Sequence, residues 1–234
     1  MSWRAPSTWL RSVWQAATNK QSPAGLGNLK DLAVDNPARA IDAIAKEQLS
    51  VAQRLPEYLD EVREEMRSKS GPGARVLHNR TVAALKEIDR VTNQLTNRGH
   101  DLGPSLELSY VAERSELLRA LSDGVCELTE AIAGAPRSGR LGTLTGDLAE
   151  GLHAVLLAAT DAMASPDGAN LELLHQLTTD RGQLMAGIRG SLVRGEQTLS
   201  IEEHQTLFTS RGLFERIIRL LRRLQAVMVA TARG

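Results

Sequence analysis

The sequence of 234 residues contains a single cysteine, few aromatic residues and no long apolar run. One thiol, Cys126, excludes an internal disulfide and a multi-cysteine zinc site, and it favours a reducing compartment. No run of about 18 apolar residues is present to span a membrane. The N-terminus also lacks the apolar core of roughly 7 to 15 residues that a secretory signal needs. We therefore expect a cytoplasmic protein.

Aromatic side chains are scarce and unevenly placed. The chain has three Trp, two Tyr and two Phe residues, and all three tryptophans lie within the first fourteen positions. The core must therefore consist mainly of Leu, Ala, Ile, Val and Met, most of which favour helices. β-Sandwiches and barrels use more aromatic and β-branched residues than this, so the composition argues against an all-β fold.

The formal net charge is zero, which does not suit a basic nucleic-acid-binding module. The charge is nevertheless unevenly distributed along the chain. Residues 1–20 carry a net charge of +3 and residues 211–234 carry +5, so the span between them carries −8. We expect no nucleic-acid partner, and the two basic ends are the places to look for others.

Apolar residues recur every three or four positions along most of the chain, which is the spacing of a helix. Breaks rich in Pro, Gly and Ser divide the pattern into six segments of about 22 to 30 residues, and none shows the period of two that is typical of strands. Asn36 followed by Pro37 predicts the start of the first helix. Ser200 with Glu203 predicts a capping box at the start of the last one. Pro56 should kink or divide the first helix.

The six apolar seams run through residues 41–66, 77–95, 118–132, 141–159, 171–192 and 214–228. The longest break surrounds Pro136 and separates three expected helices from three more. We predict an all-α fold of two consecutive three-helix bundles made of six long helices. The bundles would occupy residues 26–135 and 136–234, after an N-terminal arm at residues 1–25.

The third helix of each half carries a similar stretch, since residues 117–123 (LLRALSD) match residues 220–226 (LLRRLQA). The first helix is preceded by an entry segment at residues 29–40 (LKDLAVDNPARA), and the chain ends in a helix rich in Leu and Arg. This plan resembles PhoU-like proteins, in particular the C-terminal cytoplasmic domain of bacterial sodium/phosphate cotransporters. The resemblance covers about residues 26–232. It implies a non-catalytic regulatory or interaction domain that is associated with sodium-dependent phosphate transport and acts on a transporter or signalling protein.

The resemblance also raises the alternative of a metal-binding PhoU-like protein. Such proteins place two carboxylates on one helical face, with the spacing Glu/Asp-x-x-x-Asp, where they share a cation. Here Arg119 precedes Asp123, and Arg222 precedes Ala226, at that spacing. Because an arginine repels a cation, we expect no metal and no cofactor. Asp123 and Glu127 are the only weak candidates for ligands in this helix.

A further acidic cluster at helical spacing lies in the first segment. Its carboxylates could hold Mg²⁺ or Ca²⁺, but Arg63 and Arg67 lie close enough in sequence to relieve their repulsion. A solvated helix face explains the pattern more simply. The cluster consists of Glu57, Asp60, Glu61, Glu64 and Glu65.

Signatures of catalysis are absent from the sequence. No two histidines are three or four residues apart, and neither a Gly-x-Ser-x-Gly elbow nor a P-loop occurs. Cys126 lies in an apolar helix and is interpreted as a small buried hydrophobe. We expect a protein that is not an enzyme. A helical phosphotransfer domain, using His153 or His175, is the alternative.

Three arginines of the last helix form the candidate partner-binding site. Arg216, Arg219 and Arg223 recur at spacings of three and four, on one helical face. They could form a docking strip for an acidic partner or for anionic lipid. The plainer interpretation is an exposed face, or internal pairing with the acidic middle of the chain.

The N-terminal arm combines tryptophan with basic residues. Trp9 and Trp14 can share one helical face, with Arg11 beside them, and this composition suits the headgroup region of a membrane. We predict that these three residues face an anionic membrane surface, at the inner face of the cell membrane. The alternative is that the tryptophans pack on the bundle or on a second copy, and a homodimer stays open.

Overall fold

The computed structural model describes residues 37–68, 74–98, 106–135, 139–179 and 200–233. Nearly all of these residues are helical, and none of them lies in a strand. The prediction of an all-α helical bundle is therefore confirmed. The described helices are α3 (Pro37–Ser68), α4 (Ala74–Arg98), α5 (Leu106–Ala133), α6 (Gly139–Ala164), α7 (Gly168–Thr179) and α9 (Ile201–Arg233).

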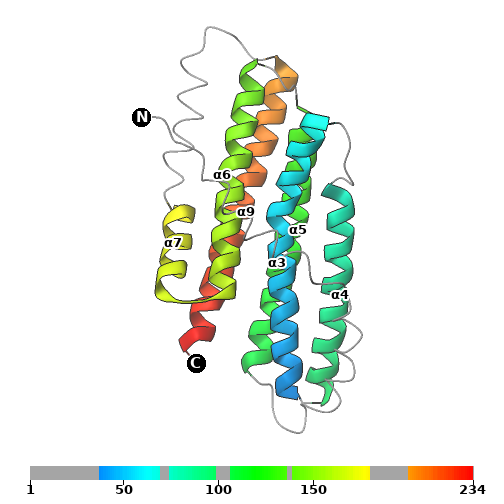
Figure 1. Ribbon diagram of the computed structural model, residues 1–234, viewed down its shortest axis with the longest axis vertical. Coiled ribbons are helices and arrows are strands. Elements are labelled where there is room, and N and C mark those ends of the chain that lie inside the picture. Colours follow the sequence, from blue (N-terminus) through cyan, green and yellow to red (C-terminus); the bar gives the residue numbers. More distant parts are fainter. Residues whose placement is uncertain (1–36, 69–73, 99–105, 136–138, 180–199, 234) are drawn as a thin grey trace.

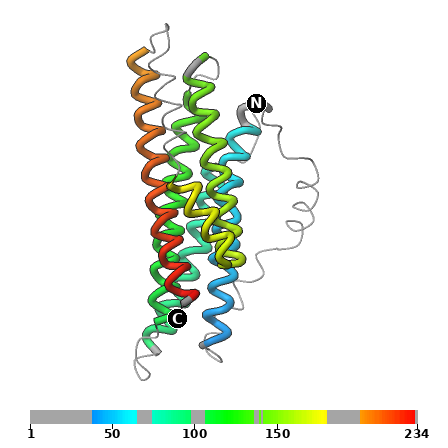
Figure 2. The backbone as a smooth tube through the Cα atoms, turned by 90° about the vertical axis from the view of Figure 1, so that its left-hand side faces the viewer, coloured from blue at the N-terminus to red at the C-terminus, as the bar shows by residue number. Residues whose placement is uncertain are grey.

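Helices α3, α4 and α5 contact one another, as do α6, α7 and α9, and the most extensive contact of the bundle, between α5 and α9, lies between these two groups of three. Figure 1 shows α4 at one side of the molecule and α7 at the other, with α3, α5, α6 and α9 between them. In the perpendicular view of Figure 2 the long helices again run alongside one another. Contacts of α5 with α9, and of α3 with α6, join the two groups.

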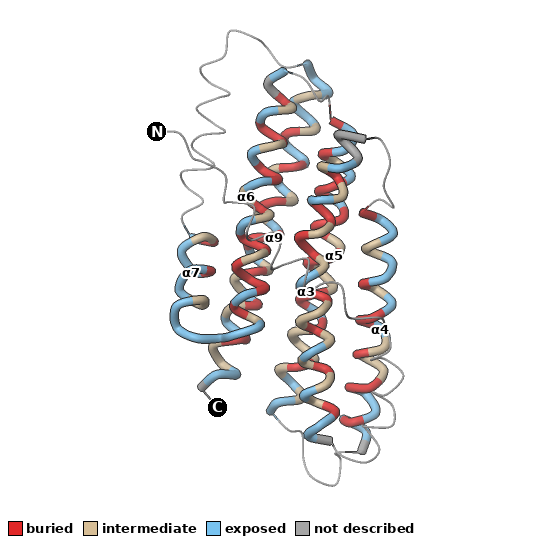
Figure 3. Tube along the Cα trace, viewed as in Figure 1, coloured by how far each residue is buried: buried red, intermediate tan, exposed pale blue. Residues whose placement is uncertain are grey.

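The buried apolar side chains of both groups form one continuous cluster, and Figure 3 shows buried positions on all of the described helices. Leu121 of α5 and Leu221 of α9 are both completely buried in it. The two groups therefore share one core. Each group is nevertheless formed by consecutive helices, in the order that the sequence predicted. Whether residues 26–135 and 136–234 fold as separate domains stays a prediction.

Local side-chain chemistry sets the starts of three helices. α3 begins at Pro37, and the predicted capping box begins α9. In that box the Ser200 backbone N–H donates to Glu203 Oε2 at 2.8 Å, and the Glu203 backbone N–H donates to Ser200 Oγ at 3.2 Å. At α7 the Asn170 backbone N–H donates to Asp167 Oδ1 at 2.8 Å. This hydrogen bond lowers the pKa of the Asp167 carboxyl.

Pro56 lies inside α3 and does not divide it. Because proline has no N–H, the carbonyl oxygen of Ala52 loses its usual partner one turn later. The Thr160 hydroxyl of α6 lies 3.3 Å from that oxygen and 3.0 Å from the carbonyl oxygen of Leu156. Thr160 has one proton to share between the two carbonyl oxygens, and through the longer contact it partly replaces, from another helix, the hydrogen bond that the proline removes.

The predicted fifth helix is only partly described. α7 covers Leu171 and Leu174 and ends at Thr179. The remainder of that seam, with Leu184, Ile188 and Leu192, lies outside the described residues.

Candidate docking surface on helix α9

One side of α9 is buried from Leu207 to Met228, and this includes the apolar seam that the sequence predicted. Phe214, Ile217, Leu221 and Leu224 are at most 1% exposed. The fit against α5 is close, since a Cβ placed on Gly124 would lie 3.2 Å from Ile217 Cγ1. This packing fixes which side chains of α9 face away from the core.

The opposite side of α9 is exposed along about seven turns. Its residues follow each other at spacings of three and four, so they lie along one line on the helix surface. None of them is acidic. We call this line the outer face of α9, and it consists of Ile201, Gln205, Phe208, Gly212, Arg216, Arg219, Arg223 and Ala226.

The three predicted arginines all lie on the outer face, on its C-terminal half. Arg216 Nη1 is 3.3 Å from Glu127 Oε2, and Arg223 Nη2 is 3.3 Å from Glu113 Oε1, both on α5. Arg219 makes no ion pair with any described side chain. Internal pairing thus involves two of the three arginines, through single exposed contacts that are worth at most about 1 kcal/mol each.

Arg222 has a different role from its neighbour Arg223. Its guanidinium donates to the carbonyl oxygen of Thr178, at the end of α7. Gln225 Nε2 likewise donates to the Leu171 carbonyl oxygen at 2.8 Å. These two side chains attach α7 to α9 and do not belong to the outer face.

Two apolar residues of the outer face were not predicted from the sequence. Ile201 is 87% exposed and Phe208 is 77% exposed. They lie seven residues apart, on the side opposite to the apolar seam, and this spacing was the available signal. The outer face therefore combines two large exposed apolar side chains in its N-terminal half with three arginines in its C-terminal half.

The two weak metal candidates point to different neighbours. Asp123 Oδ1 lies 3.6 Å from His78 Nε2 of α4, whereas Glu127 pairs with Arg216 of α9. In the acidic cluster of α3, Asp60 contacts Arg63 at 2.7 Å and His153 at 3.4 Å. Within the described ranges, no group of three or more His, Cys, Asp or Glu side chains could hold a metal ion.

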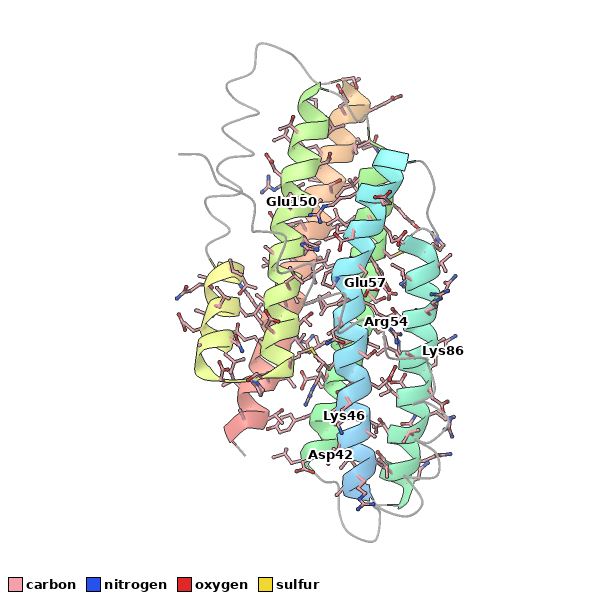
Figure 4. The ribbon with its side chains drawn as sticks, viewed as in Figure 1. Asp42, Lys46, Arg54, Glu57, Lys86 and Glu150 are labelled. Carbon is pink, nitrogen blue, oxygen red and sulfur yellow. The ribbon has the colours of Figure 1, made fainter. Side chains whose placement is uncertain are left out.

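Asp60 of the acidic cluster belongs to a network between α3 and α6. Arg63 bridges Asp60 and Glu150 of α6, whose position Figure 4 labels together with that of Glu57. Burial favours the neutral form of Asp60, but hydrogen bonds and charge from His153 and Arg63 outweigh it, so the pKa of Asp60 is lowered. Glu57 has the opposite shift, because burial, supported by the charges of Asp60 and Glu61, raises its pKa against the opposing charge of Arg54.

A buried polar chain links α3, α5 and α4. The Tyr58 hydroxyl is 3.0 Å from Ser122 Oγ, which in turn is 3.0 Å from His78 Nδ1. The rings of Tyr58 and His78 meet edge to face, with centroids 6.4 Å apart. Burial raises the pKa of Tyr58. Ser122, His78 and Asp123 resemble a hydrolase triad in composition, but Ser122 is completely buried and gives a substrate no access in this arrangement.

Cys126 and the N-terminal arm complete the predicted residues. Cys126 is buried, as expected, and burial together with the nearby Glu130 carboxylate raises the pKa of its thiol to about 11. Trp9, Trp14 and Arg11 lie outside the described residues. In the part of the chain that the structure describes, no helix is both long and apolar enough to cross a bilayer.

Comparisons with known protein families, with curated protein sequences and with solved structures give no match for this chain.

Proposed function

We propose that the protein is a non-catalytic helical module that docks through α9 on an acidic surface of a transporter or signalling protein. The observation that carries this proposal is the outer face of α9, where Arg219 has no ion pair with any described side chain and the pairs of Arg216 and Arg223 are exposed. Weak surface pairs can be exchanged for a partner's carboxylates at little cost. By binding one conformation of its partner better than another, the module would shift that partner's equilibrium.

The process in which the module acts is a separate part of the proposal. Phosphate transport and its regulation follow only from the resemblance to PhoU-like proteins. The rigid, closely packed bundle suits a domain that works by docking, because its exposed residues keep fixed positions relative to one another.

The test uses a photo-reactive amino acid at position 226, at the end of the outer face, in cells that express the full chain. We expect crosslinks to a transporter or signalling protein, and we expect the triple variant Arg216→Glu, Arg219→Glu and Arg223→Glu to lose them and to change phosphate uptake. The matched control reverses three exposed cations of α3 and α4, Lys46, Arg80 and Lys86, to glutamate. Crosslinks and uptake that are the same in both triple variants and in the wild type would overturn the proposal.

A further inference from the structure

We propose that the outer face of α9 binds the surface of a membrane rich in anionic lipids. This inference goes beyond the proposed function, because it assigns a second kind of surface to the same docking helix. The helix would lie flat, since Ile201 and Arg223 are separated by about 33 Å along its axis at 1.5 Å per residue.

The charge of the outer face suits lipid phosphates. Arg216, Arg219 and Arg223 fall within two turns, about 10 Å of helix, and guanidinium groups bind phosphate oxygens through paired, charge-assisted hydrogen bonds. Two of the three acidic side chains of α9 are engaged within the helix, and the third, Glu202, is exposed in its first turn. Glu215 pairs with Arg211 at 3.1 Å, and Glu203 is turned back to the helix start.

The apolar part of the outer face would supply the anchor. Phe208 and Ile201 are mostly exposed to water in the free protein. Inserting them among acyl chains removes this apolar surface from water, as in helices that lie in a membrane interface. Gly212 lies between Phe208 and the arginines, with open space around it. Because it has no side chain, it does not keep the helix away from a flat surface.

The shape of the outer face also suits a membrane. The other side of α9 is packed against α5, α6 and α7, so the outer face is the convex side of a helix from which single side chains project. A fluid bilayer can close around separate projecting side chains.

The experiment measures co-sedimentation of the full chain with vesicles. We expect binding to vesicles of equal parts phosphatidylcholine and phosphatidylglycerol, little binding to pure phosphatidylcholine, and weaker binding at higher salt. Phe208→Ser and Arg219→Glu should each reduce binding roughly tenfold, because each removes one apolar anchor or reverses one charge. The matched controls are Leu173→Ser on α7 and Arg80→Glu on α4, both at exposed positions, and both should bind like the wild type.

Three results would overturn the inference. The first is equal binding to both kinds of vesicle, and the second is binding that neither α9 variant reduces. The third is binding that Arg219→Glu reduces but Phe208→Ser does not, because the contact would then be electrostatic without insertion. If vesicles are not bound but the triple arginine variant loses its crosslinks, an acidic protein surface is the occupant and only this inference fails. If vesicle binding behaves as expected but crosslinks and uptake do not respond to the triple variant, only the proposed function fails.

Discussion

Cys126 is the only cysteine of the chain and is almost completely buried on α5. Its pKa of about 11, compared with an ordinary 9.0, makes the thiolate about a hundredfold rarer near neutral pH. We therefore expect Ellman's reagent to label the native protein at least about a hundredfold more slowly than the urea-unfolded protein. Rapid labelling of the native protein would show that Cys126 is accessible, and it would make a reactive nucleophile a serious alternative.

Glu57 is the residue whose ionisation opposes folding. Its pKa in the folded protein lies above the ordinary value of 4.5, so its charge costs stability above that pKa and costs nothing once the pH is below the pKa of the unfolded chain. We expect Glu57→Gln to raise the melting temperature at pH 7, and the gain to disappear as the pH falls below about 4. Circular dichroism melts at several pH values measure this difference.

A matched control for this titration is Glu116→Gln, at an exposed position on α5. This variant should not show the gain in melting temperature at pH 7 that we expect for Glu57→Gln. A gain for Glu57→Gln that persisted at low pH would mean that its cause is packing and not the charge.

Helices α3 and α6 are coupled where Pro56 interrupts the hydrogen bonds of α3. Thr160→Val removes the hydroxyl near the Ala52 carbonyl oxygen and should destabilise the protein by about 1 to 3 kcal/mol, the cost of an unpaired buried carbonyl. In a Pro56→Ala background the restored N–H can bond that carbonyl, so the same threonine substitution should cost measurably less. Urea denaturation of the two single variants and the double variant gives the coupling energy. A coupling near zero would contradict this account.

Elements were more predictable from the sequence than their contacts. The apolar seam of α9 and the box at Ser200 are local patterns, and the helix that they predicted has the expected buried side. The contact of Thr160 with the carbonyl oxygen that Pro56 leaves without its usual partner joins residues more than a hundred positions apart, and no periodicity can indicate it. The same holds for the ion pairs of Arg216 and Arg223 with α5. The arginines could be predicted as a candidate site from the sequence, but their partners could not.

At the scale of the whole molecule, the shared core predicts cooperative unfolding. Leu121→Ala and Leu221→Ala each empty a completely buried position, one in each group of three helices, and each should cost about 2 to 5 kcal/mol. Because both positions belong to one cluster, we expect a single calorimetric transition that both variants shift to lower temperature. Two transitions, each shifted by only one of the variants, would instead show that residues 26–135 and 136–234 are independent domains.

The attachment of α7 has a consequence for how the molecule opens. α7 has 12 residues, of which only Leu174 and Thr178 are buried, and a helix of this length is barely stable alone in water. It packs on α6 and α9, and Arg222 and Gln225 of α9 also hold it by two of its carbonyl oxygens. The amide protons of α7 should therefore exchange with deuterium through a local opening, well before those of α5, while the remaining helices stay folded.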